Sequence, residues 1–65
     1  MPESRSRAIS RAKRLGFPVS NVVKGDNGYY IAPRGISEKG KHAYADLRSK
    51  GYSKESAARI AHSID

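Results

Sequence analysis

Apolar and polar residues alternate first with a helical period, and that period predicts the first element of the chain. Between residues 4 and 15 the apolar positions recur at helical spacing, at Ala8, Ile9, Ala12 and Leu15. Ser4 or Ser6 can cap the amino end, and Gly16 followed by Pro18 ends the helix. The apolar stripe is narrow and built mostly of small residues, so we expect this helix to dock loosely.

Residues 19–33 have a different character, because they are rich in side chains that favour strands: Val19, Val22, Val23, Tyr29, Tyr30 and Ile31. Asn27 and Gly28 separate the two groups and both tolerate positive φ, which predicts a β-hairpin with a two-residue type I′ turn. That turn sets the pairing of the strands, which would be Val23 with Ala32 and Lys24 with Ile31. Pro33 cannot donate to a ladder, so the second strand ends there or lies at an edge.

The last part of the chain returns to a helical period and predicts two helices, over residues 37–50 and 53–64. Ser37 and Ser53 stand where each helix needs a cap, and Gly51 ends the first helix. Apolar positions face each other across the pair: Tyr44 and Leu47 on the first helix, and Ala57, Ile60, Ala61 and Ile64 on the second. We expect Ile60 in the core, so that Ile60→Ala would cost about 2–4 kcal/mol.

These elements predict one small α+β domain over residues 1–65, in the order helix, β-hairpin, helix, helix. Residues 1–16 form a basic segment with the first helix, residues 19–33 the β-hairpin and residues 37–64 the helical hairpin. A chain of 65 residues is near the lower size limit for folding alone. It contains no cysteine, so packing and caps must stabilise it without disulfides or a thiolate zinc site.

The charge of the chain indicates an anionic partner. There are 13 basic and 6 acidic residues, for a net charge of +7, and five of the cations crowd into the first fifteen residues. Arg7, Arg11 and Arg14 are spaced i, i+4, i+7 on the helix face opposite the apolar stripe, where they can bridge successive phosphates. We therefore expect the chain to bind the phosphate backbone of a nucleic acid. The candidate contact residues are Arg5, Arg7, Arg11, Lys13, Arg14, Lys24 and Arg34.

Two alternatives stay open at this stage. The short turn at Gly51 is also typical of a helix-turn-helix, in which the last helix would read bases with Lys54 and Arg59 while Glu55 opposes phosphate. A protein-interaction module is the alternative from another class. Such a module, a host-enzyme inhibitor or a virion component, would meet an acidic protein through the basic face or through exposed tyrosines.

No motif indicates catalysis, so we expect a non-enzymatic protein with no cofactor and no metal. No serine lies in a nucleophile elbow, and the glycines match no phosphate-binding loop. Glu38 and His42 share a helix face, but a third metal ligand is not evident. No apolar stretch approaches the roughly 18–20 residues of a membrane span. We expect a cytoplasmic protein with no membrane contact, in a host cytoplasm or a virion if a phage encodes it.

The segment from Tyr44 to Ala61 carries a tyrosine, a leucine and a glycine, then Ser-Lys-Glu and Ala-Ala-Arg-Ile-Ala, in that order. This order resembles a carboxy-terminal motif of small, mostly uncharacterised bacterial and bacteriophage proteins, and the tail is distantly similar to ChaB-like proteins. The middle segment, 21–35, resembles small phage-encoded proteins. The resemblance implies a small prokaryotic or viral accessory protein. It carries no site residues and leaves the basic first fifteen residues unexplained.

Overall fold

The computed structural model describes residues 4–64, and its elements follow the predicted order. They are α1 (Arg5–Leu15), a 3₁₀ turn η1 (Val19–Asn21), β1 (Val22–Gly25), β2 (Gly28–Ile31), α2 (Glu38–Ser49) and α3 (Lys54–His62). Three α-helices and one antiparallel two-stranded sheet in this part of the chain confirm the predicted α+β fold. The first three residues of the predicted basic segment 1–16, and the last residue of the chain, lie outside the described residues.

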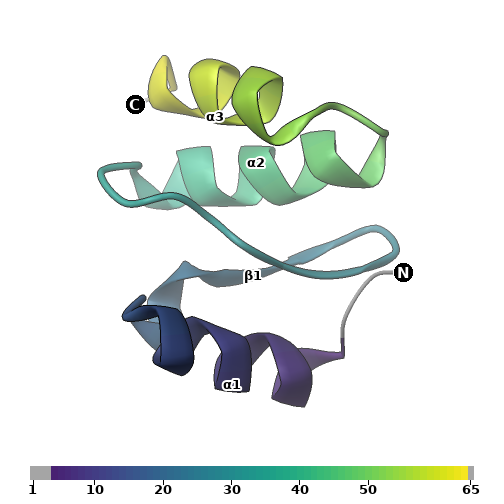
Figure 1. The fold of residues 1–65 in the computed structure, drawn as a ribbon. Helices are drawn as coiled ribbons and strands as arrows, with labels where there is room; N and C mark the ends of the chain where they lie inside the picture. Colours follow the sequence, from purple (N-terminus) through teal and green to yellow (C-terminus); the bar gives the residue numbers. More distant parts are fainter. Residues whose placement is uncertain (1–3, 65) are drawn as a thin grey trace.

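The elements stack in tiers, with the β-hairpin in the middle (Figure 1). α1 contacts one side of the hairpin, α2 contacts the other side, and α3 packs against α2. Neighbouring elements can pack closely because several of the side chains buried between them are small. Ala8 and Ala12 of α1 are fully buried, as are Ala57 and Ala61 of α3.

The predicted helix caps are confirmed. The hydroxyl oxygens of Ser4, Ser37 and Ser53 each accept a hydrogen bond from a backbone N–H in the first turn of α1, α2 and α3. Gly16 adopts the left-handed conformation (φ 85°) and ends α1. Gly51 (φ 101°) ends the turn after α2, where the backbone N–H of Tyr52 donates to the carbonyl of Leu47 at 3.1 Å.

The β-hairpin is present, but its predicted turn and pairing are wrong. The turn residues are Asp26 and Asn27, neither of which has positive φ, so the turn is not type I′. The observed pairs are Val22 with Ile31, Val23 with Tyr30, Lys24 with Tyr29 and Gly25 with Gly28. Each β1 residue therefore pairs two positions earlier on β2 than expected, which keeps every side chain on its predicted face.

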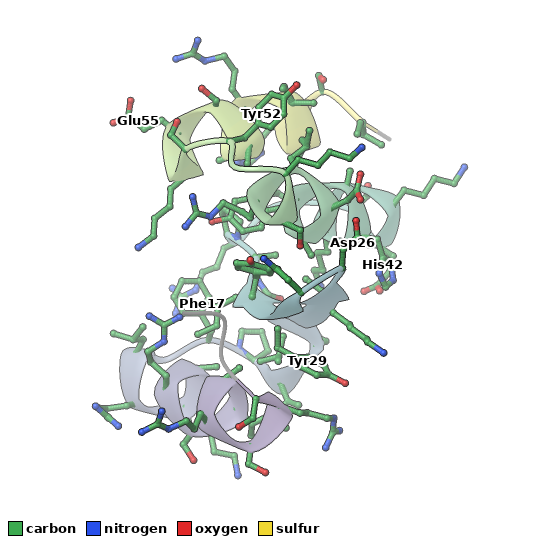
Figure 2. The ribbon with its side chains drawn as sticks, turned by 90° about the vertical axis from the view of Figure 1, so that its right-hand side faces the viewer. Phe17, Asp26, Tyr29, His42, Tyr52 and Glu55 are labelled. Carbon is green, nitrogen blue, oxygen red and sulfur yellow. The ribbon has the colours of Figure 1, made fainter. Side chains whose placement is uncertain are left out.

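Contacts with α2 explain this register. Gly25 approaches α2 so closely that a Cβ there would lie 2.8 Å from the carbonyl oxygen of Ala45 and would also meet the hydroxyl of Ser49. The backbone N–H of Asp26, labelled in Figure 2, donates to that hydroxyl at 2.9 Å, and the hydroxyl donates to the Ala45 carbonyl. These contacts place a glycine at the last position of β1 and move the turn back by one residue.

The predicted first strand is also shorter at its beginning, because Val19–Asn21 form a 3₁₀ turn. Asn21 is buried, and its side-chain amide donates to the carbonyls of Ala32 at 2.8 Å and Pro33 at 3.2 Å. The backbone N–H of Ala32 donates back to the carbonyl of Asn21 at 2.7 Å. A single buried polar side chain thus closes the open end of the hairpin and satisfies the carbonyls that follow β2.

The core lies between the hairpin, α2 and α3, and its largest cluster comprises Val23, Ala32, Ile36, Tyr44, Ala45, Ala57 and Ala61. Tyr30, Leu47 and Ala58 pack against it. One predicted core position is wrong, since Ile60 is 39% exposed; Leu15, on the apolar stripe of α1, is 57% exposed. α3 packs closely on α2 through small residues. Ala57 and Ala61 of α3 are fully buried, and a Cβ at Gly40 of α2 would lie 2.7 Å from the carbonyl oxygen of Ala61. Such an approach leaves Ile60 on the outer part of α3.

These positions give the two isoleucines different energetic roles. Ile36→Ala should lower the free energy of unfolding by about 2–4 kcal/mol, because it leaves a cavity beside Gly40 in the core. Ile60→Ala should cost about 1 kcal/mol or less, because much of the side chain already contacts solvent. Urea unfolding followed by circular dichroism measures both. A larger loss for Ile60→Ala than for Ile36→Ala would contradict this placement.

Candidate functional site

α1 brings three of the predicted contact residues to one place. Arg7, Arg11 and Arg14 line a single shallow depression together with Ser6 and Ser10. We call this surface the α1 depression. The helix contains no acidic residue between Arg5 and Leu15, so no carboxylate of α1 itself offsets these charges.

The other predicted cations lie outside the α1 depression. Arg5 begins α1, Lys13 is exposed in its last turn, and Lys24 is exposed on β1 opposite Tyr29. Lys13 and Arg14 also have a structural reason to be basic, because cations in the last turn of a helix stabilise the carbonyl end of its dipole.

Arg34 has a structural contact that the sequence did not predict. Its guanidinium donates a hydrogen bond to the carbonyl oxygen of Gly16 and lies 5.0 Å from the centre of the Phe17 ring. Arg34 therefore ties the loop after β2 to the carboxyl end of α1. The charged group of Arg34 is thus held at the end of a helix.

A cleft of about 380 Å³ opens beside the α1 depression, between α1, β2, α2 and α3. Its apolar wall combines residues from all four elements and the loops between them: Leu15, Phe17, Tyr30, Ile31, Pro33, Tyr44 and Ala58. Its charged residues are Arg11, Arg48, Lys54 and Glu55. Phe17 and Glu55, which both line the cleft, lie toward the left in Figure 2, and His42 lies toward the right.

Hydrogen bonds and ring contacts hold the side chains of the cleft in place. The Arg48 guanidinium donates to the carbonyl of Tyr52 at 2.7 Å and lies 5.9 Å from the centre of the Tyr30 ring. The Tyr30 hydroxyl donates to the side-chain oxygen of Asn27 at 2.7 Å. Contacts within the chain therefore position this part of the wall.

Tyr44 forms a buried part of the same wall, with 5% of its surface exposed. Burial raises the pKa of its hydroxyl above the ordinary value of 10.0, and the charges of Arg48 and Arg11 act in the opposite direction. Tyr44 is therefore neutral at physiological pH and adds no negative charge to the cleft.

Arg11 connects the two surfaces, because it lines both the α1 depression and the cleft. The sequence placed Arg11 on the helix face opposite the apolar stripe, whereas the structure places it at the border of that stripe. The rest of the cleft was missed, since its residues lie far apart in the sequence. The aromatic residues and the cations were visible separately, but no spacing rule joins Phe17, Tyr30 and Arg48.

Glu38 and His42, which share a helix face, do not form part of a metal site in the described residues. Glu38 pairs with Lys41 at 3.2 Å, and His42 is exposed on α2. Within residues 4–64, no three histidine, cysteine or acidic side chains gather as metal ligands would. No helix in this part of the chain has the length and apolar character needed to cross a membrane.

Residues 33–63 match the model of a protein family of unknown function, DUF7218. The matched segment contains α2 and α3 and the loop before them, and it includes the segment from Tyr44 to Ala61. This similarity agrees with the expected resemblance to small uncharacterised proteins. No curated protein and no solved structure matches the chain. The matched segment supplies one side of the cleft, while α1 and the β-hairpin, which supply the other side, lie outside it.

The contact of Arg34 with Gly16 leads to a prediction about stability. Arg34→Ala should lower the free energy of unfolding by about 1–3 kcal/mol, because it removes a charge-assisted hydrogen bond and a cation–π contact. Arg59→Ala is the matched control, since Arg59 is exposed on α3, and it should change stability by about 0.5 kcal/mol or less. Equal urea midpoints for the two variants would show that Arg34 does not hold the end of α1.

Proposed function

We propose that this protein is a small non-enzymatic accessory protein that binds nucleic acid through phosphate contacts along α1. The observation that carries the proposal is the grouping of Arg7, Arg11 and Arg14 in one depression on a helix that contains no acidic residue. Guanidinium groups bind phosphate oxygens with charge-assisted hydrogen bonds, and the hydroxyls of Ser6 and Ser10 can donate further ones.

The distribution of acidic residues supports α1 as the contact surface. On α2, Glu38 pairs with Lys41 at 3.2 Å, and Asp46 pairs at 3.0 Å with Lys50, the residue that follows the helix, so two acids of α2 already face nearby cations. α1 itself contains no acidic residue that could pair with its cations in this way. A phosphate backbone that lies along α1 would release counterions and reduce the self-repulsion of a chain with net charge +7.

The origin and location of the protein belong to the same proposal. The motif between Tyr44 and Ala61 supports a small bacterial or phage-encoded protein by its resemblance to such proteins. The match to a family of unknown function supports only a small uncharacterised protein. We place it in the cytoplasm of a bacterial host, or in a virion if a phage encodes it.

An interaction with an acidic protein is the second candidate. Within residues 4–64, four large apolar side chains are exposed, at Leu15, Val19, Tyr52 and Ile60, and such side chains anchor protein interfaces. Binding of this kind would depend on those apolar side chains as well as on charge. A nuclease-treated pull-down that retains one acidic protein would favour it over nucleic acid.

Salt dependence tests phosphate binding directly. With about three to five phosphates neutralised, the logarithm of the affinity for duplex DNA should fall against the logarithm of salt concentration with a slope of about −3 to −4.5. Fluorescence anisotropy with labelled duplexes of different sequence, between 50 and 200 mM salt, measures this slope. We expect little difference between sequences, because phosphate contacts position a protein and do not read bases.

A pair of matched variants locates the contact. Arg7→Glu with Arg14→Gln should weaken binding to every duplex at least about tenfold, because phosphate contacts on the same helix are lost. Lys39→Glu with Arg59→Gln makes the same charge changes in the first turn of α2 and the last turn of α3, and should have a much smaller effect.

Both double variants should remain folded. Glu at position 7 lies three residues after the Ser4 cap, an arrangement that favours the start of a helix. Equal losses in the two variants would show that net charge alone drives binding. No binding of folded protein at 50 mM salt would overturn the proposed function.

A further inference from the structure

We infer that the cleft binds one unpaired base of a single-stranded nucleic acid, while the adjoining phosphates lie along α1. The inference rests on the proposed function and extends it from phosphate contact to a class of nucleic acid. Its starting point is Arg11, which lines both the cleft and the α1 depression. A strand that follows the arginines of α1 therefore reaches the mouth of the cleft.

The apolar wall suits the flat face of a base. Leu15, Phe17, Tyr30 and Pro33 line the cleft, and its volume of about 380 Å³ lies in the range of small-molecule sites. Proteins hold unpaired bases by stacking on aromatic side chains and guanidinium planes, and the cleft offers both. In a duplex the bases are stacked inside the helix, so only a single strand or an end can present one.

The charged residues of the cleft offer contacts to both the phosphates and the base of a nucleotide. Arg11, Arg48 and Lys54 can contact the phosphates on either side of the bound base. Glu55 lies among them; it repels phosphate as it would any anion, but it can accept a hydrogen bond from the exocyclic amino group of a base. The cleft thus offers cations to the phosphates, an acceptor to the amino group of the base and aromatic rings to the face of the base.

The cleft is also organised before binding. Arg48 is held by the Tyr52 carbonyl and by the ring of Tyr30, and the hydroxyl of Tyr30 is held by Asn27. Arg34 lies over the Phe17 ring on the α1 side. A base that enters would not have to order these side chains, so less conformational entropy is lost on binding.

The experiment compares three labelled probes of equal length: a single-stranded oligodeoxycytidine, the same strand in a duplex, and a strand of abasic residues that keeps only the phosphates. We expect the single strand to bind about tenfold more tightly than the abasic strand, since the stacking of a base is lost in the latter. Anisotropy at one fixed salt concentration measures the three affinities.

Two matched variants assign the preference to the cleft. Leu15→Asp places a carboxylate on the cleft wall, and Val19→Asp makes the same change in charge at another exposed aliphatic side chain that does not line the cleft. Leu15→Asp should remove the preference for the single strand over the abasic strand, while Val19→Asp should leave it within about twofold of the parent protein. Both side chains are exposed, so both variants should fold.

Nuclear magnetic resonance gives a second readout that does not depend on affinity. The ring protons of Phe17 and Tyr30 should shift when the oligodeoxycytidine binds, whereas those of Tyr29 and Tyr52, which do not line the cleft, serve as internal references. Equal shifts in all four rings would overturn the assignment of the cleft.

The remaining outcomes separate this inference from the proposed function. Equal affinity for all three probes, with weaker binding by the Arg7→Glu, Arg14→Gln variant, would leave phosphate binding in place and overturn the base site. A leucine–glutamate peptide that displaces the oligodeoxycytidine and binds more tightly would assign the cleft to a protein partner. No binding of any probe would overturn both proposals.

Discussion

The close approach of the β1–β2 turn to α2 is the constraint on which the rest of the structure depends. Gly25 lies against the backbone of α2 where no Cβ fits, and the backbone N–H of Asp26 donates to the hydroxyl of Ser49. A two-stranded hairpin alone is marginally stable in water. Packed against α2 at this point, it gains a fixed turn, a fixed register and one covered face, and it becomes the tier on which α1 can dock.

The candidate site follows from the same constraint. The register places Tyr30 opposite Val23, on the face of the hairpin that packs against the core, and the ring reaches Arg48 of α2. α1 docks on the hairpin through Ala8 and Ala12, which brings Arg11 to the border of the cleft. The segment that matches a family of unknown function thus meets the rest of the chain at this cleft, so the surface depends on both parts.

Local chemistry was predictable from the sequence, and tertiary contacts were not. The serine caps and the glycines that end the helices depend on neighbouring residues, and the sequence predicted them, with Ser4 and Ser6 as alternatives for α1, where the cap is Ser4. The predicted position of the turn was wrong. Asn27-Gly28 has the stronger local preference for a two-residue turn, but Gly25 is the residue that fits against α2. Ile60 was placed in the core because helical spacing cannot distinguish the centre of a stripe from its border. Helical spacing was enough to find the arginines of α1. The cleft could not be found in this way, because four elements must pack together to form it.

The measurement that tests this account most directly is the strand register in solution. Nuclear Overhauser contacts between Hα protons across the hairpin should pair Lys24 with Tyr29 and Val22 with Ile31, as the contact of Gly25 with α2 requires. Contacts that pair Gly25 with Tyr30 and Val23 with Ala32 instead would show a turn at Asn27-Gly28. Gly25 would then not end the strand against α2, and the derivation of the cleft from that contact would be wrong.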